Sequence, residues 1–230
     1  ALLAAAFIMT AGNASAQEVN KDPFVKSYSF SLRVGQTKLT SSDFTSNWDF
    51  QKAYFQYELA LERKFGKVGS IELVMGKAVY KGDKDSIVVL GDSLDYTADM
   101  LYISISPKQY IQFNDEFALY VGGGPDYYQT KSAFNYDSPL GNVTEGQNFN
   151  TFGVHVLAGA EVIIYKNPWG SGEFDAPVSL FLEYRYTWAE IKEADKDFVD
   201  ELNATIGAGE EYHDFFIGGH ATLAGIKWRF

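Results

Sequence analysis

The sequence contains no cysteine, so neither disulfides nor thiolate metal ligands are available to this chain. Long hydrophobic runs are also missing. Apolar residues make up 46% of the chain, yet no stretch approaches the roughly 20 apolar residues that a membrane-spanning helix requires. A basic excess is missing too, because the formal net charge is -11. Nucleic-acid binding needs a basic surface to meet the phosphates, so the composition argues against that class of function.

Aromatic residues, in contrast, are abundant. The 230 residues include 18 Phe, 15 Tyr and 4 Trp, and aromatic side chains are enriched in β-strands. The length suits one domain, and a single β-barrel commonly has this size. These features favour an all-β domain whose apolar residues are spread along the chain.

The first residues differ in kind from the rest. A short apolar run, ALLAAAFIM, leads to Ala14 and Ala16 in an A-x-A pattern, and a polar start follows at Gln17. This arrangement is typical of the end of a secretory signal peptide and its cleavage site; an N-terminal core helix is the alternative. We therefore expect a partial signal peptide in residues 1–16, a periplasmic N-terminal segment in residues 17–26, and the folded domain in residues 27–230.

From residue 27 onwards, apolar and polar residues alternate with a period of two, as expected for strands with one apolar and one polar face. In the last run, for example, Ile226, Trp228 and Phe230 are separated by Lys227 and Arg229. The same alternation predicts eight strands, around residues 28–35, 55–62, 71–76, 101–106, 117–122, 154–162, 179–188 and 224–230.

Alternation alone does not tell which face of the strands is outside. A soluble lipocalin-like barrel or a sandwich would bury the apolar face. Transmembrane barrels invert this arrangement, with long outer loops, short periplasmic turns and aromatic residues near the strand ends. Here we expect long connections near residues 40–52, 81–97, 131–148 and 189–211, a tight turn at FGKVGS and a moderate turn from Pro107 to Asp115. The segment KNPWGSGEFDAP is longer than this rule predicts, but the pattern as a whole favours the transmembrane arrangement.

The chain end carries the clearest resemblance to a known family. Ile226, Trp228 and Phe230 resemble the C-terminal membrane-insertion signal of bacterial outer-membrane barrels, and FLEYRYTW in the seventh strand fits the same class. With the signal peptide, the chain resembles a small OmpA/OmpX/OmpW-like porin-family barrel. The resemblance implies an all-β, eight-stranded antiparallel transmembrane up-and-down β-barrel in the outer membrane of a Gram-negative bacterium. It also implies a monomer without cofactors, whose partners are outer-membrane lipid, lipopolysaccharide and the barrel-assembly machinery.

Charged residues on the polar face of the strands are the main candidates for a site. An eight-stranded barrel is only wide enough for its interior to be filled by side chains, so these charges should pair with each other. Two hypotheses stay open, an ion-paired plug and a narrow gated path in which pairs exchange partners. The candidate interior network comprises Arg33, Glu58, Glu62, Glu72, Glu161, Glu183 and Arg185, with Lys227 and Arg229 on the same face of the last strand.

The expected role is envelope structure and surface interaction through long extracellular loops. One alternative is a narrow pore or an OmpW-like conduit for small hydrophobic compounds, which an inward apolar patch at Leu157, Phe181 and Leu223 would favour. Another is a lipid A-modifying enzyme in which His220 activates Thr222, although no acidic residue follows them. We expect no catalytic residue and no metal site, and we expect His155 to be an inward hydrogen-bonding residue.

Overall fold

The computed structural model describes residues 28–39, 54–66, 68–84, 93–138, 141–165, 177–191 and 215–230. The predicted signal peptide in residues 1–16, its cleavage site at Ala14 and Ala16, and the segment 17–26 lie outside the described residues. The same holds for most of the first and fourth expected loops.

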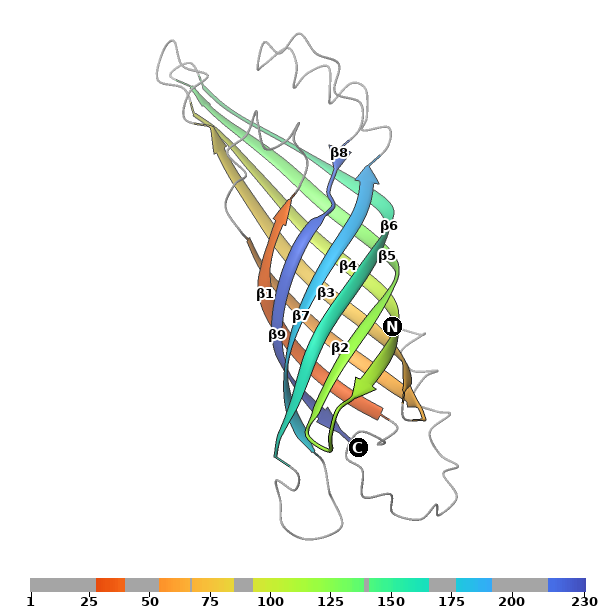
Figure 1. Cartoon of the computed structure of the whole chain (residues 1–230). Coiled ribbons are helices and arrows are strands. Elements are labelled where there is room, and N and C mark those ends of the chain that lie inside the picture. The colour runs from red at the N-terminus through yellow and green to blue at the C-terminus, as the bar shows by residue number, and fades with distance from the viewer. Residues whose placement is uncertain are drawn as a thin grey trace.

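All described regular structure is β, and it closes into a barrel (Figure 1). Consecutive long strands pair antiparallel from β1 to β7, β7 pairs with β9, and β9 pairs with β1, so the sheet has no free edge around the barrel wall. The predicted eight-stranded barrel is confirmed. The strands are β1 (Tyr28–Leu39), β2 (Tyr54–Phe65), β3 (Gly69–Lys84), β4 (Ser93–Gln112), β5 (Phe117–Ser138), β6 (Gly141–Tyr165), β7 (Val178–Ile191), β8 (Phe215–Phe216) and β9 (Gly219–Arg229).

The additional strand β8 belongs to the wall formed by β9. Its two residues pair with the end of β7, at Glu190 and Ile191, and β9 takes over the pairing with β7 from Gly219. The interruption between them is only two residues long. The ninth element is therefore an outlying piece of the eighth long strand.

Three expected connections are wrong in extent. Residues 131–148 are not a loop, because β5 and β6 stay paired as far as Ser138 opposite Gly141. In the range 81–97, the described residues 81–84 and 93–97 are strand, with Lys84 opposite Leu94. These stretches lack the apolar alternation used to find strands, but backbone pairing does not require it once the strands leave an apolar environment.

The third error concerns the expected moderate turn from Pro107 to Asp115. The structure continues β4 through Pro107 to Gln112, and the turn occupies residues 113–116. Proline lacks a backbone donor, yet Pro107 lies inside β4. Asn114 organises the actual turn, since its side-chain Oδ1 accepts the backbone N–H groups of Glu116 at 2.9 Å and Phe117 at 2.8 Å.

One end of the barrel carries tight turns and the junction of the first and last strands. We call it the turn end, and the opposite end the loop end. The backbone of Tyr28 and Phe230 exchanges two hydrogen bonds there, of 3.2 and 2.9 Å. The β2–β3 turn at the same end contains Gly66, whose φ of 70° lies in the left-handed region that favours glycine.

The outward face of the wall is apolar. Leu59, Met75 and Leu182 are 50%, 60% and 57% exposed at mid-strand, where a soluble protein would bury them. Aromatic side chains gather at the turn end, where Tyr28 stacks on Phe230 with ring centroids 6.5 Å apart. An apolar band with an aromatic girdle is the surface that a lipid bilayer solvates.

In the described part of the chain, no helix combines the length and apolar character needed to span a membrane.

The barrel interior is filled by pairing a glycine with a bulky side chain on the neighbouring strand. At Gly76, for example, a Cβ atom would lie 2.1 Å from the Tyr102 ring, so only glycine leaves room for that ring. Small and large residues that alternate across facing positions fill a narrow barrel without voids. The directly paired positions are Gly76 and Tyr102, Gly159 and Tyr120, Gly225 and Phe181, and Gly35 and Leu223.

Candidate functional site: the charged barrel interior

Strand alternation directs a set of charged side chains into the barrel. In β2, for example, Glu58 and Glu62 point inward, whereas Leu59 and Leu61 point outward. The structure places all seven residues of the candidate interior network on the inner face, and each of those residues is at most 3% exposed. They are Arg33, Glu58, Glu62, Glu72, Glu161, Glu183 and Arg185.

Arg33 of β1 lies at the centre of the larger cluster. Its Nη1 atom is 3.3 Å from a carboxylate oxygen of Glu58 and 3.3 Å from one of Glu183, and its Nη2 pairs with Glu72. The guanidinium carbon also lies 5.1 Å from the centre of the Phe181 ring. One guanidinium thus ties together strands β1, β2, β3 and β7, using the fork of donors that arginine provides.

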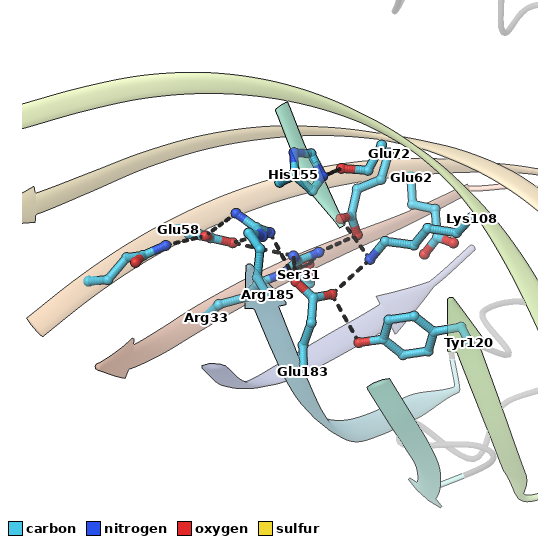
Figure 2. Close-up of polar contacts among 12 residues, drawn as sticks. Ser31, Arg33, Glu58, Glu62, Glu72, Lys108, Tyr120, His155, Glu183 and Arg185 are labelled. Atoms are coloured by element: carbon cyan, nitrogen blue, oxygen red, sulfur yellow. Dashed lines mark hydrogen bonds and ion pairs between the residues drawn. The ribbon is translucent and has the colours of Figure 1, made fainter. Parts of the chain in front are cut away.

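Two further cations complete this central cluster (Figure 2). Arg185 contacts Glu58 at 2.8 Å and Glu183 at 2.9 Å. Lys108 of β4 contacts Glu72 at 2.8 Å and Glu183 at 3.1 Å. The cluster therefore joins three cations, Arg33, Lys108 and Arg185, with three carboxylates, Glu58, Glu72 and Glu183.

Sequence reasoning missed Lys108, because the residues from Pro107 onwards were interpreted as a turn. The alternation of inward and outward side chains along β4 identifies it. Lys108 continues the inward series of Ser104 and Ser106 and is followed by inward-facing Tyr110. Extending the alternation across the proline would have placed the lysine inside the barrel.

A second cluster lies nearer the turn end. Lys227 of β9 contacts Glu62 at 2.8 Å and Glu161 at 3.2 Å, and Arg229 also pairs with Glu161. The Tyr110 hydroxyl donates to Glu62 at 2.7 Å. This cluster joins Glu62 and Glu161 to Lys227 and Arg229. Buried Lys64 lies beside it, with its Nζ 3.9 Å from the centre of the Tyr110 ring.

The pairing of opposite charges explains how these groups persist in a buried interior. A buried ion without a partner is very costly, whereas a pair with good geometry and additional hydrogen bonds recovers the cost of desolvation. Tyr120 supplies one such bond, donating to Glu183 at 3.1 Å. The arrangement is a packed polar core that ties the strands together across the barrel.

Aromatic side chains fill the interior between the central cluster and the loop end. Tyr54 and Tyr80 have ring centroids 5.2 Å apart, and those of Tyr102 and Tyr128 are 5.5 Å apart. All four are at most 8% exposed. The Tyr102 hydroxyl donates to Glu58 at 2.5 Å, so the aromatic layer rests directly on the charged one.

One hydrogen-bonded chain of buried side chains was not predicted as a unit. His155 Nδ1 lies 2.7 Å from Asp126 Oδ1, and His155 Nε2 lies 2.9 Å from Ser106 Oγ. Only the inward, hydrogen-bonding role of His155 was expected. Spacing along the chain could not identify these partners, since Ser106, Asp126 and His155 lie on three different strands, β4, β5 and β6.

The structure also shows the surroundings of the residues named for the enzyme and the conduit alternatives. His220 lies on the outer face, with its Nδ1 hydrogen-bonded to the Tyr184 hydroxyl and its ring 4.7 Å from that of Tyr186. Thr222 is exposed and paired in the ladder with Tyr184. The imidazole is therefore engaged with tyrosines of β7, not set up as a base for a hydroxyl nucleophile.

The inward apolar residues Leu157, Phe181 and Leu223 are at most 5% exposed. Phe181 and Leu223 fill the space above Gly225 and Gly35, which makes them packing residues. In the described ranges, no group of three or more His, Asp or Glu side chains has the arrangement of a metal site.

Solved structures with a similar arrangement come from outer-membrane proteins. Neisserial surface protein A has a TM-score of 0.49 and 14% identity, with 88% of this chain and 97% of that chain covered. OprG from Pseudomonas aeruginosa has a TM-score of 0.49 and 14% identity, covering 90% and 98%. Ail, the attachment invasion locus protein of Yersinia pestis, has a TM-score of 0.47 and 11% identity, covering 90% and 99%.

A comparison with curated proteins gave no match. The family model described as the outer membrane protein beta-barrel domain, however, matches residues 1–211, which is most of the chain. That match agrees with the closed antiparallel barrel, its apolar outer face and its polar core. This chain belongs to the outer membrane protein β-barrel domain family.

Proposed function

We propose that this outer-membrane protein is a closed scaffold that presents a rigid β-ribbon at the cell surface for interaction with other molecules. The observation that carries the proposal is the unequal length of the strands. Four neighbouring strands, β3 to β6, continue past the loop end of the barrel, as Figure 1 shows. In barrels of this class the long connections are extracellular and the short turns are periplasmic, so the ribbon is an extracellular feature.

The ribbon consists of the ends of β3 to β6 that extend beyond the pairing with β2 and β7. β2 accompanies β3 only as far as Gln56 opposite Ala78, while β3 continues to Lys84. On the other side, β7 is paired with β6 only as far as Ala189 opposite Gly153, while β6 begins twelve residues earlier at Gly141. Within the described residues, the extending ends of β3 and β6 have a neighbour on one side only.

Such strand edges have a ladder partner on one side within the described residues. An extended segment of another molecule can add to an edge of this kind, with the main chain supplying affinity and alternate side chains supplying specificity. The composition of the outward residues supports a polar contact, since Asn148 and Asn150 near the base of the β6 edge are both exposed.

The packed interior supports a scaffold over a pore. The central charges are at most 4% exposed, and the tyrosine layer covers them on the loop side. An eight-stranded barrel is narrow enough for side chains to fill its interior, which favours a scaffold over a pore. The two functions therefore depend on different residues. Interaction depends on the ribbon, and conduction depends on the interior charges.

The test compares cells that express the native protein with cells that express a shortened ribbon, in which residues 134–145 are replaced by Asn-Gly to reclose the β5–β6 hairpin. Attachment to surfaces coated with extracellular-matrix proteins is measured together with autoaggregation. We expect the shortened variant to lose attachment or aggregation while its level in the outer membrane stays unchanged. Equal behaviour of the two proteins at equal surface level would contradict the proposal.

A further inference from the structure

The wall of the barrel has a gap in its hydrogen-bond ladder between β4 and β5. The two strands pair with Ser104 opposite Asp126 and resume with Lys108 opposite Gly122, in the same register on both sides. Residues 105–107 of β4 have no ladder partner in β5. The other ladders between long strands of the described barrel are continuous, apart from a register shift at the turn end of β6 and β7. We call residues 105–107 and 123–125 the β4–β5 seam.

Two prolines account for the seam. In the shared register, Pro107 faces Gly123 and Pro125 faces Ile105. Proline has no backbone N–H, so each of these positions lacks the donor that a ladder residue supplies. Pro107 and Pro125 are the only prolines inside the described strands, and they lie on opposite sides of the same interface.

The Ser106, His155 and Asp126 side chains bridge this seam from inside the barrel. Ser106 lies on the β4 side of the seam, and its Oγ is 2.9 Å from His155 Nε2. Asp126 lies next to the seam on β5, and its Oδ1 is 2.7 Å from His155 Nδ1. The imidazole, which comes from β6, therefore joins β4 to β5 where the backbone ladder does not.

The glycines of β5 make room for this bridge. His155 is the ladder partner of Gly124, and Gly124 lies between His155 and the seam residues of β4. A Cβ atom at Gly124 would lie 2.0 Å from the carbonyl oxygen of Ile105, so glycine is needed for the close approach of β4 and β5 where the imidazole reaches across to Ser106.

The hydrogen bonds are complete with a neutral imidazole. Nδ1–H donates to the Asp126 carboxylate, and Nε2 accepts from the Ser106 hydroxyl. The Tyr128 hydroxyl donates to the second oxygen of Asp126 at 3.1 Å. The order of groups is that of a serine hydrolase triad, but Ser106 is 0% exposed and does not meet a substrate in this arrangement. The hydrogen-bonded side chains therefore hold neighbouring strands together.

We propose that the Ser106–His155–Asp126 hydrogen-bond chain is a latch that keeps the β4–β5 seam closed, and that the seam is where the barrel wall opens locally toward the lipid. The latch replaces missing backbone bonds with side-chain bonds. Opening of the seam then requires the latch to break together with fewer backbone bonds than a continuous ladder has, because each proline removes one donor.

The experiment measures amide hydrogen exchange of the refolded protein in lipid nanodiscs, residue by residue, for the native chain and for His155→Ala. Loss of the latch removes two side-chain bonds. We therefore expect about tenfold faster exchange at the backbone amides next to the seam, consistent with the loss of one to two net hydrogen bonds, and unchanged exchange in the β1–β9 ladder. Ser29→Ala is the matched control, since it removes a buried hydroxyl that donates to Glu62 at 3.2 Å beside continuous ladders.

Two further variants make the outcome decisive. Pro107→Val with Pro125→Val restores the missing donors, and in that background His155→Ala should change exchange near the seam less than twofold. Ser106→Ala removes a single hydroxyl and serves if His155→Ala does not fold. Exchange that rises equally over all strands, or that does not rise at the seam in either single variant, would overturn the proposal.

Discussion

At the scale of single residues, burial decides which charges matter. Glu183 and Asp99 each contact a lysine at about the same distance, 3.1 Å for Glu183 and Lys108 and 2.8 Å for Asp99 and Lys77. The first pair is fully buried, while the side chains of the second are 42% and 46% exposed. Removal of a buried partner leaves other ions uncompensated, which does not happen at a solvated surface.

The contrast gives a matched prediction. We expect Glu183→Gln to lower the free energy of unfolding by about 3 to 5 kcal/mol, because Arg33, Lys108 and Arg185 lose a shared carboxylate. Asp99→Asn should cost no more than about 1 kcal/mol. Urea unfolding of both variants in lipid vesicles measures the difference, and equal losses would show that the central cluster adds no more stability than a surface pair.

Glycine positions give a second residue-scale prediction. We expect Gly76→Ala to destabilise the barrel by about 1 to 3 kcal/mol, since the new methyl group would overlap the Tyr102 ring. Gly69→Ala is the control, because the nearest atom to its Cβ would be 3.6 Å away. The same unfolding experiment compares the two, and a Gly76→Ala protein as stable as the control would refute the packing argument.

At the scale of elements, the long strands β3 and β6 each have two structurally different parts. The parts that form the wall are paired on both sides, whereas the extending ends of β3 and β6 are paired on one side within the described residues. The hairpin beyond Ala133 and Gly146 therefore adds little to closure of the barrel.

This separation predicts that the ribbon can be shortened without loss of the barrel. We expect replacement of residues 134–145 by Asn-Gly to change the free energy of unfolding by less than about 1 kcal/mol, because the wall contacts are untouched. The measurement is urea unfolding together with the shift in electrophoretic mobility between folded and heated protein. A variant that no longer refolds would show that the ribbon helps to form the barrel.

At the scale of the whole molecule, the barrel is inverted relative to a soluble one. Its apolar residues face outward into the bilayer of the outer membrane, and its interior holds clusters in which carboxylates pair with cations. Closure removes the edges of the wall, which is required because unpaired backbone groups are very costly in lipid. The proposed interaction with other molecules uses the parts that leave the membrane.

The filled interior predicts that the protein does not conduct ions. Refolded protein inserted into planar bilayers should give no reproducible conductance steps, because the central charges are at most 4% exposed and paired. Glu58→Ala and Arg185→Ala should remain silent and be less stable, not conductive. Steps that change in these two variants would favour the narrow-pore alternative.

The sequence by itself determined the architecture of this protein. The period of two in runs such as Tyr57 to Leu61 identifies the strand faces, and the absence of long apolar segments excludes spanning helices from the prediction. Inward candidates such as Arg33 and Glu183 follow from the same parity, because in a strand each side chain's face is fixed by counting along the chain.

Tertiary structure alone decided which residues meet. The partners of His155 lie on strands 29 and 49 residues away in sequence, and their contact depends on register, which the sequence does not display. The placement of Lys108 and the extension of β5 and β6 likewise depend on pairing between backbones, which continues through prolines and polar residues that carry no strand signal. Alternation is a local property of one strand, whereas the core network, the seam and the ribbon are properties of neighbouring strands.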